Sequence, residues 1–251
     1  MWPAGGKRWT CKPRWTAIRS TLCGCSANCP PRLPDDAIVT ADSGSSANWY
    51  ARQLRFRGNM RGSLSGTLAT MGPGVPYGIG AKFAHPGRPV IVFAGDGAMQ
   101  MNGLAELITV KHYWRQWDDP RLIIAILHNN DLNQVTWEMR AMSGSPKFAE
   151  SQTLPDVDYA GFAASLGLHG DTVTGPDQLA GVWETALSAD RPTVLDVHTD
   201  PNMPPDPPRM RRGSSSSPPP PRSWAATRTP GGSSRPGSRP RRRNSSPHKN
   251  T

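Results

Sequence analysis

The chain has 251 residues, 36% of them hydrophobic, and a formal net charge of +10. This length suits one domain of ordinary size or two small ones. The basic excess lies at the two ends, because residues 1–33 and 207–251 contain no acidic residue. Residues 34–206 carry twelve basic and nineteen acidic residues, a net charge of −7. The composition therefore argues against a basic nucleic-acid-binding face on the central part of the chain.

Local composition argues against two further classes of protein. No run approaches the roughly 18 apolar residues of a transmembrane helix, and no apolar stretch near the N-terminus resembles a secretory signal. All four cysteines fall in the N-terminal segment with the spacing C-x11-C-x-C-x3-C: Cys11, Cys23, Cys25 and Cys29. Paired zinc knuckles have a different spacing. We interpret these residues as incidental thiols of a cytoplasmic protein, with a metal or disulfide role as the alternative.

Three compositional regions divide the chain. Residues 1–33 form an irregular basic segment without an apolar stripe, and residues 34–200 show regular alternating structure. Residues 201–251 are rich in proline, serine and arginine. Such a tail cannot bury enough apolar surface to offset the entropy of ordering it, so we expect it to be disordered.

The central region alternates strand and helix signals. In chain order, the patterns predict a strand at 37–40, helices at 45–54 and 72–84, a strand at 89–94, a helix at 98–117, a strand at 121–127, helices at 157–166 and 177–187, and a strand at 193–197. Ser45 or Ser46 is the expected N-cap of the first helix. Near-continuous apolar strands that alternate with helices are typical of an α/β fold with a doubly wound, mostly parallel sheet.

Polar residues follow two of these strands. Gly95-Asp96-Gly97 comes between a buried strand and a helix, and its glycines let backbone amides approach a phosphate. A carboxylate beside a phosphate is repulsive unless a cation lies between them, and Mg²⁺ is the hard divalent ion that fits best. Asn129-Asn130 follows the next strand and offers amide oxygens. Ligands of open α/β sheets lie beyond the carboxyl ends of strands, so these motifs predict a phosphate and metal site.

Gly-Asp-Gly, then a helix and a strand, then Asn-Asn, resembles the thiamine diphosphate signature of enzymes that decarboxylate 2-oxo acids. Upstream, Met71-Gly72-Pro73-Gly74-Val75-Pro76 and Ile79-Gly80-Ala81 are similar to a segment of the group of pyruvate oxidase, quinone-dependent pyruvate dehydrogenase and acetolactate synthase. Four motifs in the right order make the resemblance specific. It covers residues 34–200 and corresponds to the C-terminal, diphosphate-binding domain of such enzymes.

The resemblance implies a role for individual residues. Mg²⁺ would be bound by the side chains of Asp96 and Asn130 and by the main-chain carbonyl of Leu132. The diphosphate would lie against Gly95, Gly97 and Ala98. Thr70, Met71 and Gly72 would form part of the aminopyrimidine pocket, and the segment Asp42-Ser43-Gly44 would approach the cofactor. The 31 residues between Gly97 and Asn129 exceed the family's usual spacing, and we place the excess in a helix extension and loop around residues 113–120.

In this family a glutamate on a separate pyrimidine-binding domain activates the cofactor. Residues 1–33 are too few to form such an α/β domain, so we expect that domain or subunit to act in trans, and we expect the chain to be inactive alone. The resemblance also implies a pyruvate-like 2-oxo acid as substrate and a homo- or hetero-oligomer, because active sites of the family form between subunits.

Several residues have a structural interpretation beside a functional one. We interpret Glu106 as a structural carboxylate, and Glu138 as a surface carboxylate with a substrate-side role as the alternative. His128 is expected to be satisfied locally. Trp114, Trp117 and Met139 are expected in the core or in an interface rather than against the cofactor.

Three hypotheses for the whole chain follow. The chain is a diphosphate-binding enzyme component, or a truncated or frameshifted fragment that cannot turn over alone, or a polyanion-binding protein through its Arg-rich tail. The fragment hypothesis is motivated by the abrupt change into aperiodic basic sequence near residues 33 and 206. A dinucleotide-binding dehydrogenase is rejected, because the glycine after Gly72 and Gly74 comes at Gly78, one position late for G-x-G-x-x-G.

Overall fold

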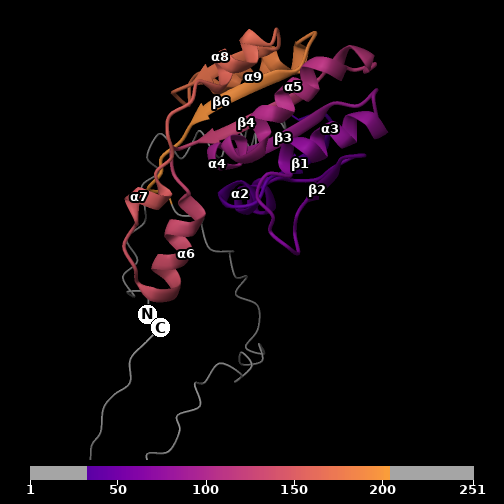
Figure 1. Cartoon of the computed structure of the whole chain (residues 1–251). Helices are drawn as coiled ribbons and strands as arrows, with labels where there is room; N and C mark the ends of the chain where they lie inside the picture. Colours follow the sequence, from indigo (N-terminus) through magenta and orange to yellow (C-terminus); the bar gives the residue numbers. More distant parts are fainter. Residues whose placement is uncertain (1–32, 204–251) are drawn as a thin grey trace, which may run out of the picture. The chain divides into compact units, whose positions relative to one another are not determined.

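The computed structural model describes residues 33–203, which form one α/β domain around a six-stranded parallel sheet (Figure 1). The strand order is β2-β1-β3-β4-β6-β5. The strands are β1 (Ile38–Ala41), β2 (Arg61–Leu64), β3 (Val90–Gly95), β4 (Leu122–His128), β5 (His169–Val173) and β6 (Thr193–His198). The helices are α2 (Ser45–Gln53), α3 (Gly74–Ala84), α4 (Asp96–Ala98), α5 (Leu104–Tyr113), α6 (Asn133–Ser143), α7 (Ala149–Gln152), α8 (Tyr159–Ser165) and α9 (Leu179–Ser188).

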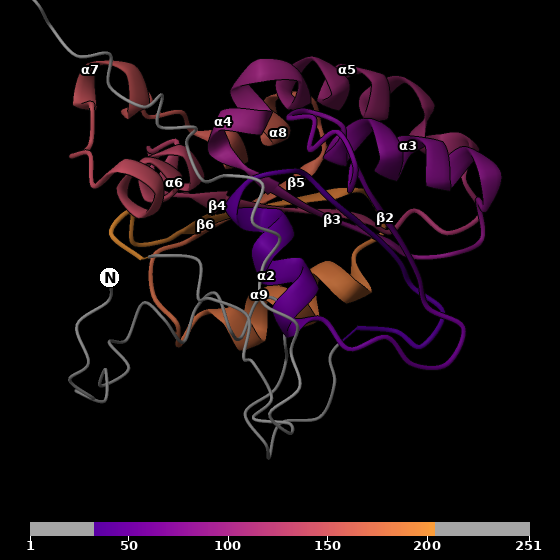
Figure 2. The same ribbon diagram turned by 90° about the horizontal axis from the view of Figure 1, so that it is seen from below.

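Helices cover both faces of the sheet, as Figure 2 shows. Helices α3, α5 and α8 lie over one face, and α2 and α9 over the other. Each face of the sheet carries an apolar core, and residues of β3 and β4 alternate between the two. Val92 and Ile124 pack in the core under α3, α5 and α8, and Phe93 and Ala125 pack in the core under α2 and α9. Both central strands are buried on both sides, which explains their near-continuous apolar sequences.

The structure confirms the predicted fold class and the four predicted strands to within a residue. Two strands were not predicted: β2, which has the sequence RGSL, and β5, which has the sequence HGDTV. These are the edge strands of the sheet. Most residues of β2 are exposed and most residues of β5 are half-buried, so neither strand contains the apolar run that marks a buried strand.

Two other predictions change in detail. The expected helix over residues 98–117 is a succession of α4, a π-helical turn (Met99–Gly103), α5 and a 3-10 turn (Trp114–Gln116). The expected serine N-cap of α2 is wrong, because Gly44 occupies the N-cap position. The Ser46 hydroxyl instead donates to the carbonyls of Asp42 and Ser43 at 3.0 and 2.9 Å.

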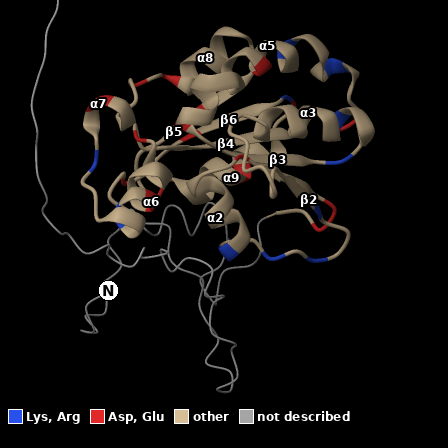
Figure 3. Cartoon of the chain, turned by 60° about the horizontal axis from the view of Figure 1, so that its bottom comes forward, with Lys and Arg blue, Asp and Glu red and all other residues tan. Residues whose placement is uncertain are grey.

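The expectations for the chain ends, including the four cysteines, concern residues 1–32 and 204–251 and lie outside the described residues. Within residues 33–203, no helix is long and apolar enough to cross a membrane. In Figure 3, the Lys and Arg positions of the described domain are scattered over several elements rather than gathered into one basic patch.

A buried lysine closes the amino ends of β3 and β4. Lys82, on α3, is fully buried, and its ammonium donates to the carbonyls of Pro86, Arg88 and Asp119 at 3.1, 2.7 and 2.5 Å. The Asp119 carboxylate in turn pairs with Arg121 at 2.6 Å. These polar groups of the segments that precede β3 and β4 therefore have hydrogen-bond partners within the chain.

Candidate functional site

A cavity of about 450 Å³ lies beyond the carboxyl ends of β1, β3 and β4, at the end of the sheet opposite to Lys82. Its walls come from the start of α2, the loop after β2, the Gly95–Ala98 turn, the loop after β4 and the first turns of α6. Parallel neighbours end at the same edge of a sheet, so the fold gathers residues far apart in sequence around one hollow.

Asp96 lies at the end of β3 on the cavity wall, with only 3% of its surface exposed. Its Oδ1 accepts the Gly97 amide at 2.9 Å, and its Oδ2 accepts the Asn129 amide at 2.9 Å and the Asn130 amide. Burial raises the pKa of Asp96, although these three amides oppose the shift. The carboxylate therefore joins the ends of β3 and β4 and retains acceptor capacity toward the cavity.

The two glycines beside Asp96 differ in their surroundings. A Cβ atom added to Gly95 would meet no atom within 4 Å, which shows open space on that side of the turn. A Cβ atom on Gly97 would lie 2.8 Å from Leu132 Cδ2 and 3.3 Å from Leu154 Cδ1. Gly97 is thus required for close packing below the cavity, whereas Gly95 leaves room beside it.

Asp42, at the end of β1, fixes the segment that precedes α3. Its buried carboxylate accepts the Gly72 amide at 2.8 Å through Oδ1 and the Gly74 amide at 2.8 Å through Oδ2. Burial raises the pKa of Asp42 despite these bonds. Asp42 does not itself line the cavity. Its bonds to Gly72 and Gly74 fix the segment that places the neighbouring Met71 on the cavity wall.

Asn130 and Leu132 belong to the loop after β4. Asn130 adopts a left-handed backbone with φ of 54°, and its Nδ2 donates to Asp156 Oδ1 at 3.2 Å. No donor among residues 33–203 is bonded to its Oδ1. The Leu132 carbonyl accepts the Thr136 amide at 3.2 Å and keeps its second lone pair. Both oxygens can therefore accept a further partner.

The cavity wall also includes residues that the sequence did not single out. Asp131 is buried, its Oδ2 pairs with Lys147 at 3.0 Å, and its Oδ1 has no hydrogen-bond partner in the described part of the chain. Asn48 of α2 donates to Gln134 of α6 at 2.5 Å, and Gln134 donates to Glu138 at 2.7 Å. These contacts depend on α6, which is not among the helices predicted from the sequence.

The structure brings most of the predicted site residues together. The cavity is lined by eight of them: Ser43, Gly44, Met71, Gly95, Asp96, Gly97, Ala98 and Leu132. Three others lie off its wall: Thr70 is exposed, Gly72 is buried, and Asn130 is half-buried. Glu138 lines the cavity, whereas Glu106 does not. Trp117 is buried in the core, as expected.

His128 lies buried behind the metal-type residues, at the end of β4. Its Nδ1 is 2.8 Å from Asp196 Oδ1, and its Nε2 is 3.2 Å from Asp156 Oδ1 without hydrogen-bond alignment. Burial alone would lower the pKa of His128, but the Asp196 bond and the surrounding carboxylates outweigh it and raise the pKa. The local partner expected for His128 from the sequence is present at Nδ1, whereas Nε2 is buried without a hydrogen-bond partner among residues 33–203.

His128, Asp196 and His198 have ligand-type atoms within 4.8 Å of one another. Asp196 is already bonded to Nδ1 of His128, and none of the three residues lines the cavity at the carboxyl ends of the strands. The cluster is therefore interpreted as a hydrogen-bonded His128–Asp196 pair with the His198 ring packed against His128, rather than as a second metal site.

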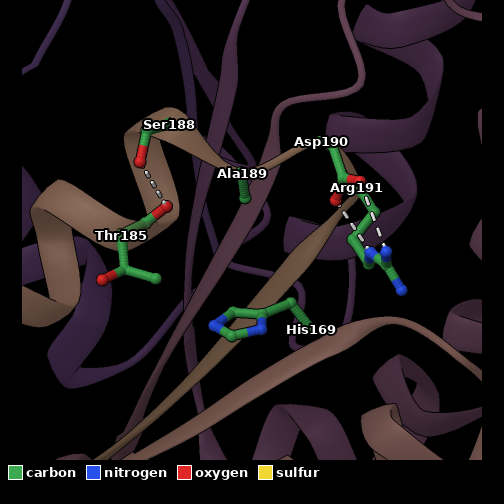
Figure 4. A pocket seen from close by; sticks show the side chains of 6 residues that line it. All are labelled: His169, Thr185, Ser188, Ala189, Asp190 and Arg191. Carbon is green, nitrogen blue, oxygen red and sulfur yellow. Dashed lines mark hydrogen bonds and ion pairs between the residues drawn. The ribbon is translucent and has the colours of Figure 1, made fainter.

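A second hollow, of about 310 Å³, lies at the amino ends of β5 and β6 (Figure 4). It is formed by the end of α9 and the residues that begin β5 and precede β6: His169, Thr185, Ser188, Ala189, Asp190 and Arg191. Asp190 and Arg191 are paired there at 2.9 Å. Because it lies at the amino ends of the strands, this hollow is not where open α/β sheets bind their ligands.

The fold and the site define an α/β protein with an acidic turn after one central strand, an Asn-Asn loop after the next, and a cavity between them. Comparison with known proteins gives the family. Residues 42–197 match the thiamine pyrophosphate enzyme, C-terminal TPP binding domain, and the chain belongs to this family.

Several curated relatives are similar to the same part of the chain. The thiamine pyrophosphate-containing protein YdaP of Bacillus subtilis (strain 168) is 35% identical over 69% of this chain and 28% of its own length. Acetolactate synthase isozyme 2 large subunit of Escherichia coli (strain K12) is 31% identical over 67% of this chain and 30% of its own length. Acetolactate synthase of B. subtilis is 31% identical over 67% of this chain and 28% of its own length. The chain thus spans less than a third of these relatives.

Proposed function

We propose that this domain binds thiamine diphosphate through Mg²⁺ at the carboxyl ends of β3 and β4, as part of an enzyme that decarboxylates a pyruvate-like 2-oxo acid. The observation that carries the proposal is Asp96, a buried carboxylate held by three backbone amides beside a cavity of about 450 Å³. A fixed carboxylate with remaining acceptor capacity is suited to a hard cation.

The oxygens around this point support a magnesium site. The Asn130 carboxamide has a free Oδ1, and the Leu132 carbonyl has a free lone pair. With Asp96 they would form a set of three hard oxygen ligands, which would leave coordination positions for diphosphate and water. The unpartnered Asp131 Oδ1 adds negative charge to the same wall. This donor set fits Mg²⁺ and does not resemble the nitrogen and sulfur ligands of zinc sites.

The remaining wall fits the rest of the cofactor. Gly95, Gly97 and Ala98 would lie against the diphosphate, because Gly95 leaves open space and no side chain blocks that approach. Ser43 and Gly44 face the same cavity from the α2 side. Thr70, Met71 and Gly72 would contact the aminopyrimidine, with Asp42 holding this segment in place.

When bound, thiamine diphosphate supplies the carbanion and the electron sink that decarboxylation of a 2-oxo acid requires. This chain's residues would bind the diphosphate, neutralise it through the metal and keep the cofactor fixed. Glu138 is the only glutamate among the described residues that line the cavity, and its carboxylate accepts a hydrogen bond from Gln134. We therefore propose that the activating glutamate comes from a pyrimidine-binding domain in trans, within a homo- or hetero-oligomer, and that residues 33–203 are inactive without it.

Calorimetric titration of the purified chain with thiamine diphosphate, with and without Mg²⁺, tests this proposal. We expect binding that requires the metal, and we expect Asp96→Ala to abolish it while circular dichroism shows a retained fold. Asp190→Ala is the matched control, since Asp190 is an exposed carboxylate at the other end of the sheet. Metal-independent binding, or unchanged affinity in Asp96→Ala, would refute the metal assignment.

A further inference from the structure

The backbone of Asn130 is fixed on both sides of its side chain. Its amide donates to Asp96 Oδ2, and its carbonyl accepts the Leu154 amide at 2.9 Å. Its φ of 54° is a left-handed conformation, which asparagine adopts more readily than most other non-glycine residues. The remaining freedom of Asn130 is therefore the rotation of its side-chain amide.

The segment that fixes this backbone also delivers a partner for the side chain. The Leu132 amide donates to the Gln152 carbonyl at 2.8 Å, and this pairing continues to Leu154. Asp156 follows two residues later, and its Oδ1 accepts the Asn130 Nδ2 at 3.2 Å. An ionised carboxylate can only accept hydrogen bonds, so it attracts the NH₂ group and directs the Asn130 Oδ1 the other way.

Asp156 is exposed, with 77% of its side chain accessible, and it would be a loose partner without a second contact. That contact is His128, whose Nε2 lies at an ion-pair distance of 3.2 Å from the same Oδ1 atom, without hydrogen-bond alignment. His128 is itself held by Asp196 on the neighbouring strand β6, at 2.8 Å through Nδ1. A chain of contacts thus runs from the buried sheet to the Asn130 carboxamide.

We propose that Asp156 is a positioning residue that orients the Asn130 carboxamide, so that its Oδ1 faces the divalent cation, with His128 and Asp196 holding Asp156 in place. The inference rests on the proposed function, because it assigns Asn130 to the metal. Partners behind metal ligands fix ligand orientation, and their loss typically lowers metal affinity by roughly 10- to 100-fold.

The experiment compares Asp156→Ala, Asp156→Asn and Asp190→Ala with the unaltered full chain. Mn²⁺ replaces Mg²⁺ as the probe at saturating thiamine diphosphate, and electron paramagnetic resonance measures the free ion. We expect Asp156→Ala to bind Mn²⁺ roughly tenfold more weakly. Asp156→Asn should recover most of this loss, because its amide oxygen can still accept from Asn130. Asp190→Ala should bind as the unaltered chain does.

A second measurement needs no metal. The side-chain amide protons of Asn130, observed by ¹⁵N-resolved NMR without metal or cofactor, should shift in Asp156→Ala and stay unchanged in Asp190→Ala. Unshifted protons in Asp156→Ala would overturn the proposal, since the hydrogen bond would then be absent in solution. Because Asp156 is exposed, we expect the variant to fold, and its thermal unfolding midpoint checks this.

The outcomes separate this inference from the proposed function. If the unaltered chain binds neither Mn²⁺ nor thiamine diphosphate, the proposed function fails and the inference fails with it, whatever the NMR result. If the chain binds both and Asp156→Ala binds Mn²⁺ equally well, the inference alone is overturned. Equal weakening in Asp156→Ala and Asp156→Asn would also overturn it, because the charge of Asp156 rather than its hydrogen bond would then matter.

Discussion

The two ends of the sheet use their polar groups in opposite ways. At the amino ends of β3 and β4, Lys82 donates to three carbonyls and Asp119 binds Arg121, so the polar groups are satisfied within the chain. At the carboxyl ends, Asp96 retains acceptor capacity and Asp131 Oδ1 has no partner in the described residues. The first end stabilises the fold, whereas the second keeps binding capacity that the fold alone does not use.

The largest effect on stability is expected at the amino end. Lys82→Met removes the side-chain donor of the half-buried Arg88 and Asp119 carbonyls and one of two donors to the Pro86 carbonyl, so we expect the free energy of unfolding to fall by about 3 kcal/mol. Urea unfolding followed by circular dichroism measures this change. The affinity for thiamine diphosphate, measured on the folded variant, should not change.

Lys111→Met on α5 is the control, because Lys111 is half-exposed and its removal should alter stability by less than about 0.5 kcal/mol. If Lys82→Met were as stable as this control, the three contacts of Lys82 would not stabilise the amino end.

Substitutions at Gly95 and Gly97 separate cofactor binding from packing at the carboxyl end of β3. Gly97→Ala places a methyl group 2.8 Å from Leu132 Cδ2 and should lower the free energy of unfolding by about 1–2 kcal/mol. Gly95→Ala meets no atom within 4 Å and should keep its stability. It adds a methyl group to the cavity wall, so we expect thiamine diphosphate to bind roughly tenfold more weakly, or about 1.4 kcal/mol.

Calorimetry and urea unfolding on the two glycine variants distinguish packing from binding. Unchanged cofactor affinity in Gly95→Ala would show that the cofactor does not lie against this turn.

The smallest effect concerns the ion pair at the amino end. Burial would raise the pKa of Asp119, but the hydrogen bonds and the charge of Arg121 outweigh it and hold the pKa below its usual value. The ionised carboxylate therefore adds stability above the unfolded pKa of about 3.9, and this contribution is lost as the pH falls through the lower folded pKa.

Asp119→Asn should consequently lower the free energy of unfolding by about 0.5–1 kcal/mol at pH 7. The difference from the unaltered chain should shrink below about pH 4, which acid titration of urea stability measures. A difference that grew toward low pH would contradict the sign of this pKa shift.

The sequence by itself determined the α/β class, the central strands and the family. Residues 90–94 and 122–127 are apolar at nearly every position because strands covered on both faces must be, and this pattern is readable without a structure. The turn Gly95-Asp96-Gly97 and the Asn129-Asn130 pair are also readable without a structure, because each consists of residues adjacent in the sequence.

Only the tertiary structure decided how these motifs meet. The edge strands β2 and β5 form because pairing with a neighbour compensates for their weak apolar patterns. Asp42 holds Gly72 from 30 residues away, and Asp156 reaches Asn130 through a segment 26 residues later in the chain. Such contacts depend on strand order and loop pairing, and sequence spacing does not encode them. The residues proposed to bind the cofactor were therefore predictable from local sequence, whereas the residues proposed to position them were not.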